Sequence, residues 1–445
     1  MRYRLAALIS ILWAVSAVAQ VMPSGGPSIL SRQPSLRTGP ADALFTIRPS
    51  ASIVGRYDHG LFLPTTDAEG RLSGQDSYGI AAVLGLDGFH QTRNSVVSLD
   101  YRGQFRHYTA NDYLDGSDHA LSLGYERRLT NRTLVAGTAF GGLYSRSFGV
   151  PGLGRMSPPI VDIGPEIIPT NEIFDSRVYY AGAGANIVHQ KSMRLSFGAG
   201  ANGFMVHRRS RSLAGVIGTS AQGNVAYRLS RRHTVGADYT FTKFDFTRGF
   251  GISDMHIVSL NYAAQLTRRW TFSARAGIFR FENLRVVTVQ LDPVIAEILG
   301  RRTGLETQHQ VNYGPIVRAV LTREFQRGSF NASYSRIVSP GNGIYLSSIA
   351  ESARVGYNYR GSRRWNSGVA AGVTQYGALT QTIGKYHNLY GSAQTSYRLK
   401  RFLHLTGSFI VRSHGIGEGS DFKRTSYSAS IGLAFAPGEI PLSLN

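Results

Sequence analysis

The stretch Tyr227–Tyr239 reads YRLSRRHTVGADY, and near-copies of it recur along the chain. They are YERRLTNRTLVAG from Tyr125, AQLTRRWTFSARAG from Ala264, YRGSRRWNSGVAAG from Tyr359 and YRLKRFLHLTGSF from Tyr397. Around each basic pair, apolar and polar residues alternate, which is the pattern of a β-strand with two different faces. Each copy therefore predicts the end of one strand, a tight basic turn and the beginning of the next strand.

The alternation extends over long segments. Between Val97 and Tyr108 the apolar residues fall at every second position, with polar residues between them, and residues 193–205, 389–399 and 427–435 follow the same rule. Soluble strands average about 5–6 residues, whereas a tilted strand that crosses a membrane needs about 9–11. The length of these segments favours a transmembrane β-barrel.

Short turns are predicted near Thr92, Arg128, Gln190, Arg231, Arg268, Gln326, Arg363 and Lys400. With one strand before them, around Phe45–Tyr57, and one after them, around Thr425–Phe435, they give an all-β, antiparallel up-and-down barrel of about 18 strands, with 16 as the alternative. An even number places both termini on the periplasmic side. A β-propeller has a similar repeat length, but its blades hold four short strands, and two long ones are predicted here.

The pattern from Leu44 to Phe435 resembles bacterial outer-membrane β-barrels, porin-like ones in particular. YSRIVSPGNG from Tyr334 is also similar to outer-membrane barrels associated with exopolysaccharide export. The resemblance implies a Gram-negative outer membrane and recognition of the last strand by the barrel-assembly machinery. Such barrels commonly end on an aromatic residue, whereas here a tail follows Phe435, so we expect a barrel over 44–436 and a short tail over 437–445.

The first residues predict an export signal. Arg2 and Arg4 precede an apolar run, Leu5–Val18, and Ala17-Val18-Ala19 fits a cleavage site after Ala19. A retained signal anchor is the alternative. Residues 20–43 are rich in Pro, Ser and Gly, which predicts a flexible periplasmic segment.

Composition narrows the possible functions. The absence of Cys excludes disulfides and thiolate metal sites. The formal net charge of +21 suggests acidic partners. Because export makes nucleic acid an unsuitable partner, we expect lipid, lipopolysaccharide or an acidic solute instead.

Two sets of residues are candidates for function. The interface aromatics share one face and lie beside the predicted turns; they are Tyr227, Trp270, Tyr359, Trp365 and Tyr397. The pore-lining arginines fall on the opposite, inward face among small and polar residues; they are Arg102, Arg106, Arg194, Arg275, Arg318, Arg354, Arg398 and Arg412. Such arginines favour anions in a lumen, or they pair with the wall acids Asp87, Asp100 and Asp238.

Two long connections, 149–175 and 284–304, are candidates to narrow the pore; the alternatives are a mobile lid for the first and a surface decoration for the second. In the second, Asp292 as N-cap, Pro293 as the first helical residue and Gly300 as the stop predict a helix of about two turns.

The sequence predicts a porin-like outer-membrane channel for diffusion of small, anionic solutes. The alternative is the barrel of an exopolysaccharide export or assembly system, closed by loops or by a partner. A third possibility is a membrane-embedded enzyme, but the twelve His residues are scattered. We therefore expect no enzyme, catalytic set, metal or cofactor, and we leave a homo-oligomer open.

Overall fold

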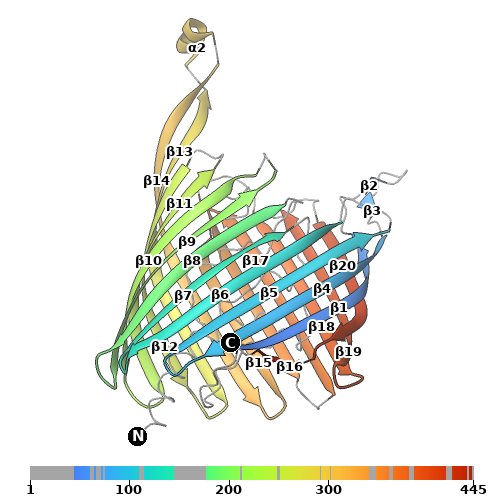
Figure 1. Cartoon of the computed structure of the whole chain (residues 1–445). Helices are drawn as coiled ribbons and strands as arrows, with labels where there is room; N and C mark the ends of the chain where they lie inside the picture. The colour runs from blue at the N-terminus through green and yellow to red at the C-terminus, as the bar shows by residue number, and fades with distance from the viewer. Residues whose placement is uncertain are drawn as a thin grey trace.

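The structure, a computed structural model, is a closed β-barrel of 18 antiparallel strands (Figure 1). The residues that it describes are 45–60, 65–66, 72–73, 76–109, 115–144, 177–210, 213–247, 251–290, 292–300, 302–339, 347–359, 364–379, 385–416, 423–437 and 440–442. The predicted signal, the segment 20–43 and the connection 149–175 lie outside these residues.

The barrel strands follow one another around the wall in chain order. They are β1 (Phe45–His59), β4 (Asp76–Gln91), β5 (Ser95–Tyr108), β6 (Gly116–Thr130), β7 (Thr133–Tyr144), β8 (Val178–Gln190), β9 (Leu195–Arg208), β10 (Gly215–Arg228), β11 (His233–Thr247), β12 (Gly251–Gln265), β13 (Trp270–Gln290), β14 (Thr303–Phe325), β15 (Gly328–Ser339), β16 (Ser348–Tyr359), β17 (Trp365–Ala378), β18 (Tyr386–Arg398), β19 (Leu403–Ile416) and β20 (Lys423–Phe435). A small separate hairpin consists of β2 (Thr65–Thr66) and β3 (Leu72–Ser73). The predicted count of 18 and the up-and-down order are confirmed.

The barrel closes on β1. One edge of β1 pairs with β4 from Thr46 to His59, and the other pairs with β20 from Ala51 to His59. Below the end of β20, the short strand β21 (Ile440–Leu442) pairs with Phe45–Ile47. The tail after Phe435 therefore extends the seam of the barrel.

One end of the barrel carries the short turns, which we call the short-turn end; the other is the loop end. Most predicted turns lie where the alternation placed them, for example at 229–232 between β10 and β11 and at 266–269 between β12 and β13. The turn predicted at Arg128 was misplaced: β6 continues to Thr130, and the register shifts between Arg128 and Thr130. Arg363 lies outside the described residues, between β16 and β17.

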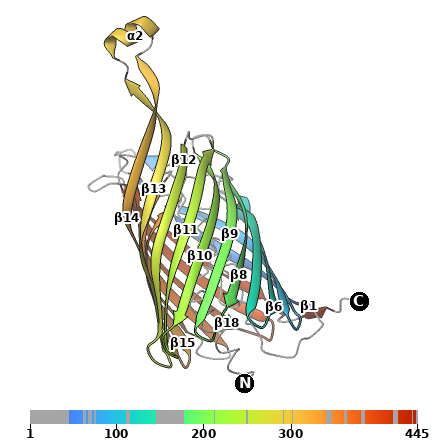
Figure 2. The same ribbon diagram turned by 90° about the vertical axis from the view of Figure 1, so that its left-hand side faces the viewer.

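The connection predicted over 284–304 contains the predicted helix, α2 (Pro293–Leu299). The Asp292 side chain accepts a hydrogen bond from the backbone N–H of Val294 at 2.9 Å, and Gly300 ends the helix with φ of 63°. The rest of the predicted loop is wrong, because β13 and β14 remain paired up to Gln290 and Thr303. This hairpin stands out beyond the rim of the barrel instead of folding into its mouth (Figures 1 and 2).

The outer face of the barrel is apolar and exposed. Leu260 is 68% exposed, Ile278 64% and Ile431 64%, and many other large apolar side chains share this face. A continuous apolar band of this kind is the lipid-facing surface of a transmembrane barrel. No helix in the described part of the chain is long and apolar enough to cross a membrane.

Aromatic residues border this band at both ends. At the short-turn end Trp365 packs against Tyr397 with ring centroids 5.8 Å apart, and Tyr227 is exposed. At the loop end tyrosines pair with histidines on neighbouring strands: Tyr239 Oη lies 2.8 Å from His256 Nδ1. Two aromatic belts on either side of an apolar band are typical of outer-membrane barrels.

Candidate functional site

The inner wall of the barrel is the candidate site, because a barrel of 18 strands is wide enough to hold an aqueous channel. Inner-face positions are those that alternate with the exposed apolar ones. Through the middle of many strands these positions carry small and polar residues, such as Asn202 on β9, Ser220 on β10 and Ser259 on β12. Such a surface is compatible with water and with hydrogen-bonding solutes.

A group of ion pairs occupies the inner wall from β1 to β6. Arg102 Nη2 lies 3.4 Å from Asp87, and its Nε lies 3.2 Å from Asp100. Further along β5, Arg106 Nη1 lies 3.2 Å from Asp118 on β6. The register creates these pairs, because Asp87 on β4 is directly opposite Asp100 on β5.

A further group of polar contacts lies toward β1 at the loop end. Arg56 Nη2 lies 3.2 Å from Asp58, and the hydroxyl of Tyr108 donates a hydrogen bond to the other carboxylate oxygen of Asp58 at 2.8 Å. The Asp58 and Asp118 side chains are both 0% exposed. Carboxylates buried in this way need a cationic or hydrogen-bonding partner. We infer that the ion pairs in this part of the wall stabilise the barrel.

A second polar group is centred on Asp238 of β11. Its carboxylate pairs with Arg275 of β13 and accepts hydrogen bonds from Asn261 and, at 2.7 Å, from the hydroxyl of Ser259. Arg318 of β14 is directly opposite Arg275 in the sheet. A second arginine therefore lies on the strand next to the Asp238–Arg275 pair on the inner wall.

Apart from Glu324, which has inward parity at the short-turn end of β14, the inner wall of the barrel from β14 to β19 is basic. Arg318, Arg354 and Arg412 face inward there, and in the sheet Arg354 lies between Ser333 and Gly372. From 328 to 437 the acidic residues are Glu351, Glu418 and Asp421. Glu351 faces outward and pairs with Arg336, while Glu418 and Asp421 lie outside the described residues.

The other predicted pore-lining residues lie at the short-turn end. Arg194 is in the turn between β8 and β9 and is exposed, and Arg398 is the last residue of β18. The interface aromatics also lie there: Trp270 and Trp365 begin β13 and β17, and Tyr359 ends β16.

The loop end of the inner wall is not small and polar, contrary to the sequence-based expectation. An inner aromatic cluster packs there, made of Tyr180, Phe204, Phe244, Phe246, Phe279 and Phe281. Phe244 and Phe281 are 0% exposed, and the Phe204 and Phe244 rings meet at 6.2 Å in a T-shaped arrangement. Bulky side chains on the inner face reduce the cross-section of the barrel at this level.

Sequence reasoning missed this cluster, although β11 carries its signal. In TFTKFDF, residues 240–246, Phe244 and Phe246 share a face with Thr240 and Thr242, whereas the outward face becomes polar at Lys243 and Asp245. The period of two continues, but from Lys243 onward the apolar residues face inward and the polar residues face outward. That exchange marks the height at which the outer wall leaves the apolar part of the bilayer.

In the described part of the chain, no group of three or more His, Asp or Glu side chains is placed to hold a metal ion. The histidines that sequence reasoning considered for catalysis occupy separate strands; His107, for example, pairs with Asp115 on the outer face at 2.6 Å.

No protein-family model matches the chain, and no curated protein matches its sequence. Among solved structures it is similar to Pseudomonas aeruginosa OccK2 (OpdF), with 10% identity and a TM-score of 0.41 over 88% of this chain and 98% of that one. It is also similar to the outer membrane protein OpdK of P. aeruginosa, with 12% identity and a TM-score of 0.41 over 89% of this chain and 99% of that one. It is similar as well to the ferric-catecholate import receptor Fiu of E. coli K12, with 8% identity and a TM-score of 0.44 over 91% of this chain and 82% of that one. At these values the evidence for the fold is the strand pairing itself.

Proposed function

We propose that this barrel is a porin-like channel of the outer membrane that passes small anionic solutes. The observation that carries the proposal is the charge balance of the inner wall. Asp58, Asp87, Asp100, Asp118 and Asp238 each lie within an ion pair with an arginine of the same wall. Arg318, Arg354 and Arg412 add positive charge on the remaining strands.

An excess of fixed positive charge on a low-dielectric wall raises the local concentration of anions. The inner aromatic cluster supports a size limit, since it narrows the barrel at the loop end. In this proposal the short-turn end faces the periplasm, as it does in outer-membrane barrels, and the chain arrives there after signal cleavage following Ala19.

The test is single-channel conductance of the refolded protein in a planar bilayer with a potassium chloride gradient. We expect discrete conductance steps and a reversal potential that favours chloride. A channel that prefers potassium would contradict the anion preference, and a folded, inserted protein that stays silent would contradict an open channel.

A second candidate is the barrel of an exopolysaccharide export or assembly system with a closed pore. The observation that favours it is the burial of the inner aromatic cluster, whose members are at most 9% exposed. Alanine in place of both Phe244 and Phe281 distinguishes the two candidates. If the cluster closes the barrel, the wild type is silent and the double variant conducts; if the cluster only narrows an open channel, both conduct and the variant has the larger steps.

A further inference from the structure

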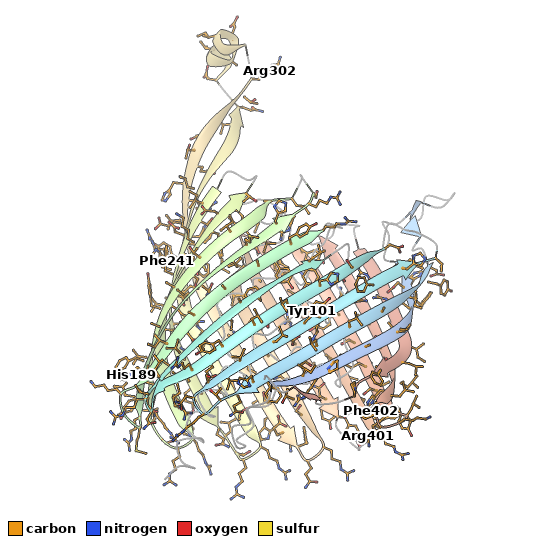
Figure 3. The ribbon with its side chains drawn as sticks, viewed as in Figure 1. Tyr101, His189, Phe241, Arg302, Arg401 and Phe402 are labelled. Atoms are coloured by element: carbon orange, nitrogen blue, oxygen red, sulfur yellow. The ribbon has the colours of Figure 1, made fainter. Side chains whose placement is uncertain are left out.

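Basic side chains surround the short-turn end of the barrel, and Figure 3 shows many long side chains with nitrogen tips extending from this end. The described short turns each contain at least one; representatives are Arg93, Arg132, Lys191, Arg231, Arg268, Arg327, Arg364 and Lys400. In the described residues near this end the acids are Glu126 and Glu324. The end therefore attracts anions, and the question is where one of them is held.

Arg323 on β14 has the most organised surroundings of these basic residues. Its Cζ lies 5.0 Å from the centroid of the Trp270 ring and 4.5 Å from that of Phe325. Trp270 is directly opposite Arg323 on β13, and Phe325 is two residues further along β14 on the same face. Contact with two aromatic rings restricts the arginine side chain without neutralising its charge.

The Arg323 surroundings also lack a competing anion. In the described part of the chain Arg323 has no ion pair, and its Nε is buried without a hydrogen-bond partner. Its neighbour Glu324 has the opposite, inward parity, and the Glu324 backbone N–H donates to the carbonyl oxygen of Arg269 at 2.9 Å. That bond ties the exposed turn that carries Arg269 to the beginning of the exposed turn that carries Arg327.

Aromatic residues define the depth of this site. The Phe325 ring packs edge-on against Tyr357 at 5.8 Å, and Trp270, Phe325 and Tyr357 all belong to the outward face at the short-turn end. Tryptophan and tyrosine settle at the level of lipid headgroups. Arg323 consequently lies at headgroup height on the lipid-facing side, where a solute inside the lumen does not reach it.

We propose that Arg323, framed by Trp270 and Phe325 and assisted by Arg269 and Arg327, is a binding site for the phosphodiester headgroup of a phospholipid. A planar guanidinium offers two parallel N–H donors to phosphate oxygens, and basic residues near a membrane surface favour anionic lipid. The occupant is a phospholipid of the adjacent leaflet and not a free anion, because the site opens sideways from the wall. This site is independent of what the lumen transports.

The test is native mass spectrometry of the intact detergent-solubilised barrel titrated with phosphatidylglycerol. We expect Arg323→Gln to weaken the first phosphatidylglycerol adduct by about tenfold, the loss of charge-assisted hydrogen bonds to one phosphate. Arg323→Lys, which keeps the charge but not the planar fork, has an intermediate effect. The matched control is Arg280→Gln, an outward arginine toward the loop end that is paired with Glu282, and it leaves the adduct unchanged.

Equal phosphatidylglycerol binding by the wild type and Arg323→Gln overturns the proposal. The proposal is also overturned if inorganic phosphate displaces phosphatidylglycerol and this displacement depends on Arg323, because the site would then recognise a free ion. If Arg323→Gln does not refold, as judged by its heat-dependent gel mobility, the lysine variant decides: undiminished lipid binding by Arg323→Lys contradicts a site built on the guanidinium plane.

Discussion

Arg102 on β5 and Arg354 on β16 both face the interior of the barrel, but their strands provide different surroundings. Arg102 lies between Asp87 and Asp100, and on the same wall Arg106 pairs with Asp118 and Tyr108 donates to Asp58. Arg354 lies on a stretch of wall, from β15 to β20, where no described inner-face position carries an acid. We infer that the β1–β6 wall uses charge to hold the barrel together, and that the β14–β19 wall uses it to act on solutes.

The strongest test of this comparison is Asp118→Asn. Asp118 and Arg106 are both buried, so the variant leaves a guanidinium without its counter-charge, and removing one partner of a buried pair costs about 3–5 kcal/mol. We expect a correspondingly lower free energy of unfolding in urea titrations from detergent micelles. A change below about 1 kcal/mol would contradict a structural role for this pair.

A weaker effect is expected on the other wall, and on a different property. Arg354→Gln removes one positive charge from the solute path. A unit charge at about 4 Å in water contributes about 1 kcal/mol, so the chloride-to-potassium permeability ratio falls by up to about fivefold. Reversal potentials measure this ratio, and urea unfolding of the same variant checks that stability changes little. Unchanged selectivity would remove Arg354 from the solute path.

Asp100→Asn sharpens the comparison within the ion-paired wall. The Asp100 side chain is 30% exposed, and when Asp100 is replaced, Asp87 remains beside Arg102. We expect a loss of at most about 1 kcal/mol in the free energy of unfolding, well below that of Asp118→Asn, since solvent screens the pair and one partner survives. A loss as large as that of Asp118→Asn would show that the ion pairs of this wall act as one unit.

Salt concentration distinguishes the electrostatic roles of the two walls without a mutation in the β14–β19 wall. Between 0.1 and 1 M salt the Debye length falls from about 10 Å to about 3 Å. Chloride preference, which acts through water in the lumen, therefore declines over this range. The buried pairs are shielded from the salt, so the difference in unfolding free energy between wild type and Asp118→Asn stays nearly constant. A parallel decline of both quantities would place the two walls in the same electrostatic environment.

Several local features could be predicted from the sequence because they depend on residues that are neighbours in the chain. Basic turns, several of them beside aromatic residues, recur at the short-turn end of the barrel, and they predicted the 18 strands that the structure confirms. Asp292, Pro293 and Gly300 predicted α2 because a helix of this length is specified by its own ends. The position of the turn near Arg128 was wrong, because a register shift between β6 and β7 depends on the pairing of two strands.

Period-two alternation by itself determined that this chain forms long antiparallel strands with one apolar and one polar face, since that information is local. Only the closed barrel decided which acid meets which arginine. Asp238 and Arg275 lie on β11 and β13 and meet across β12, and Tyr108 reaches Asp58 on β1. The barrel also decided that Phe244 and Phe281 belong to one buried cluster on the inner face. Contacts of this kind follow from register and curvature, which are properties of the assembled sheet.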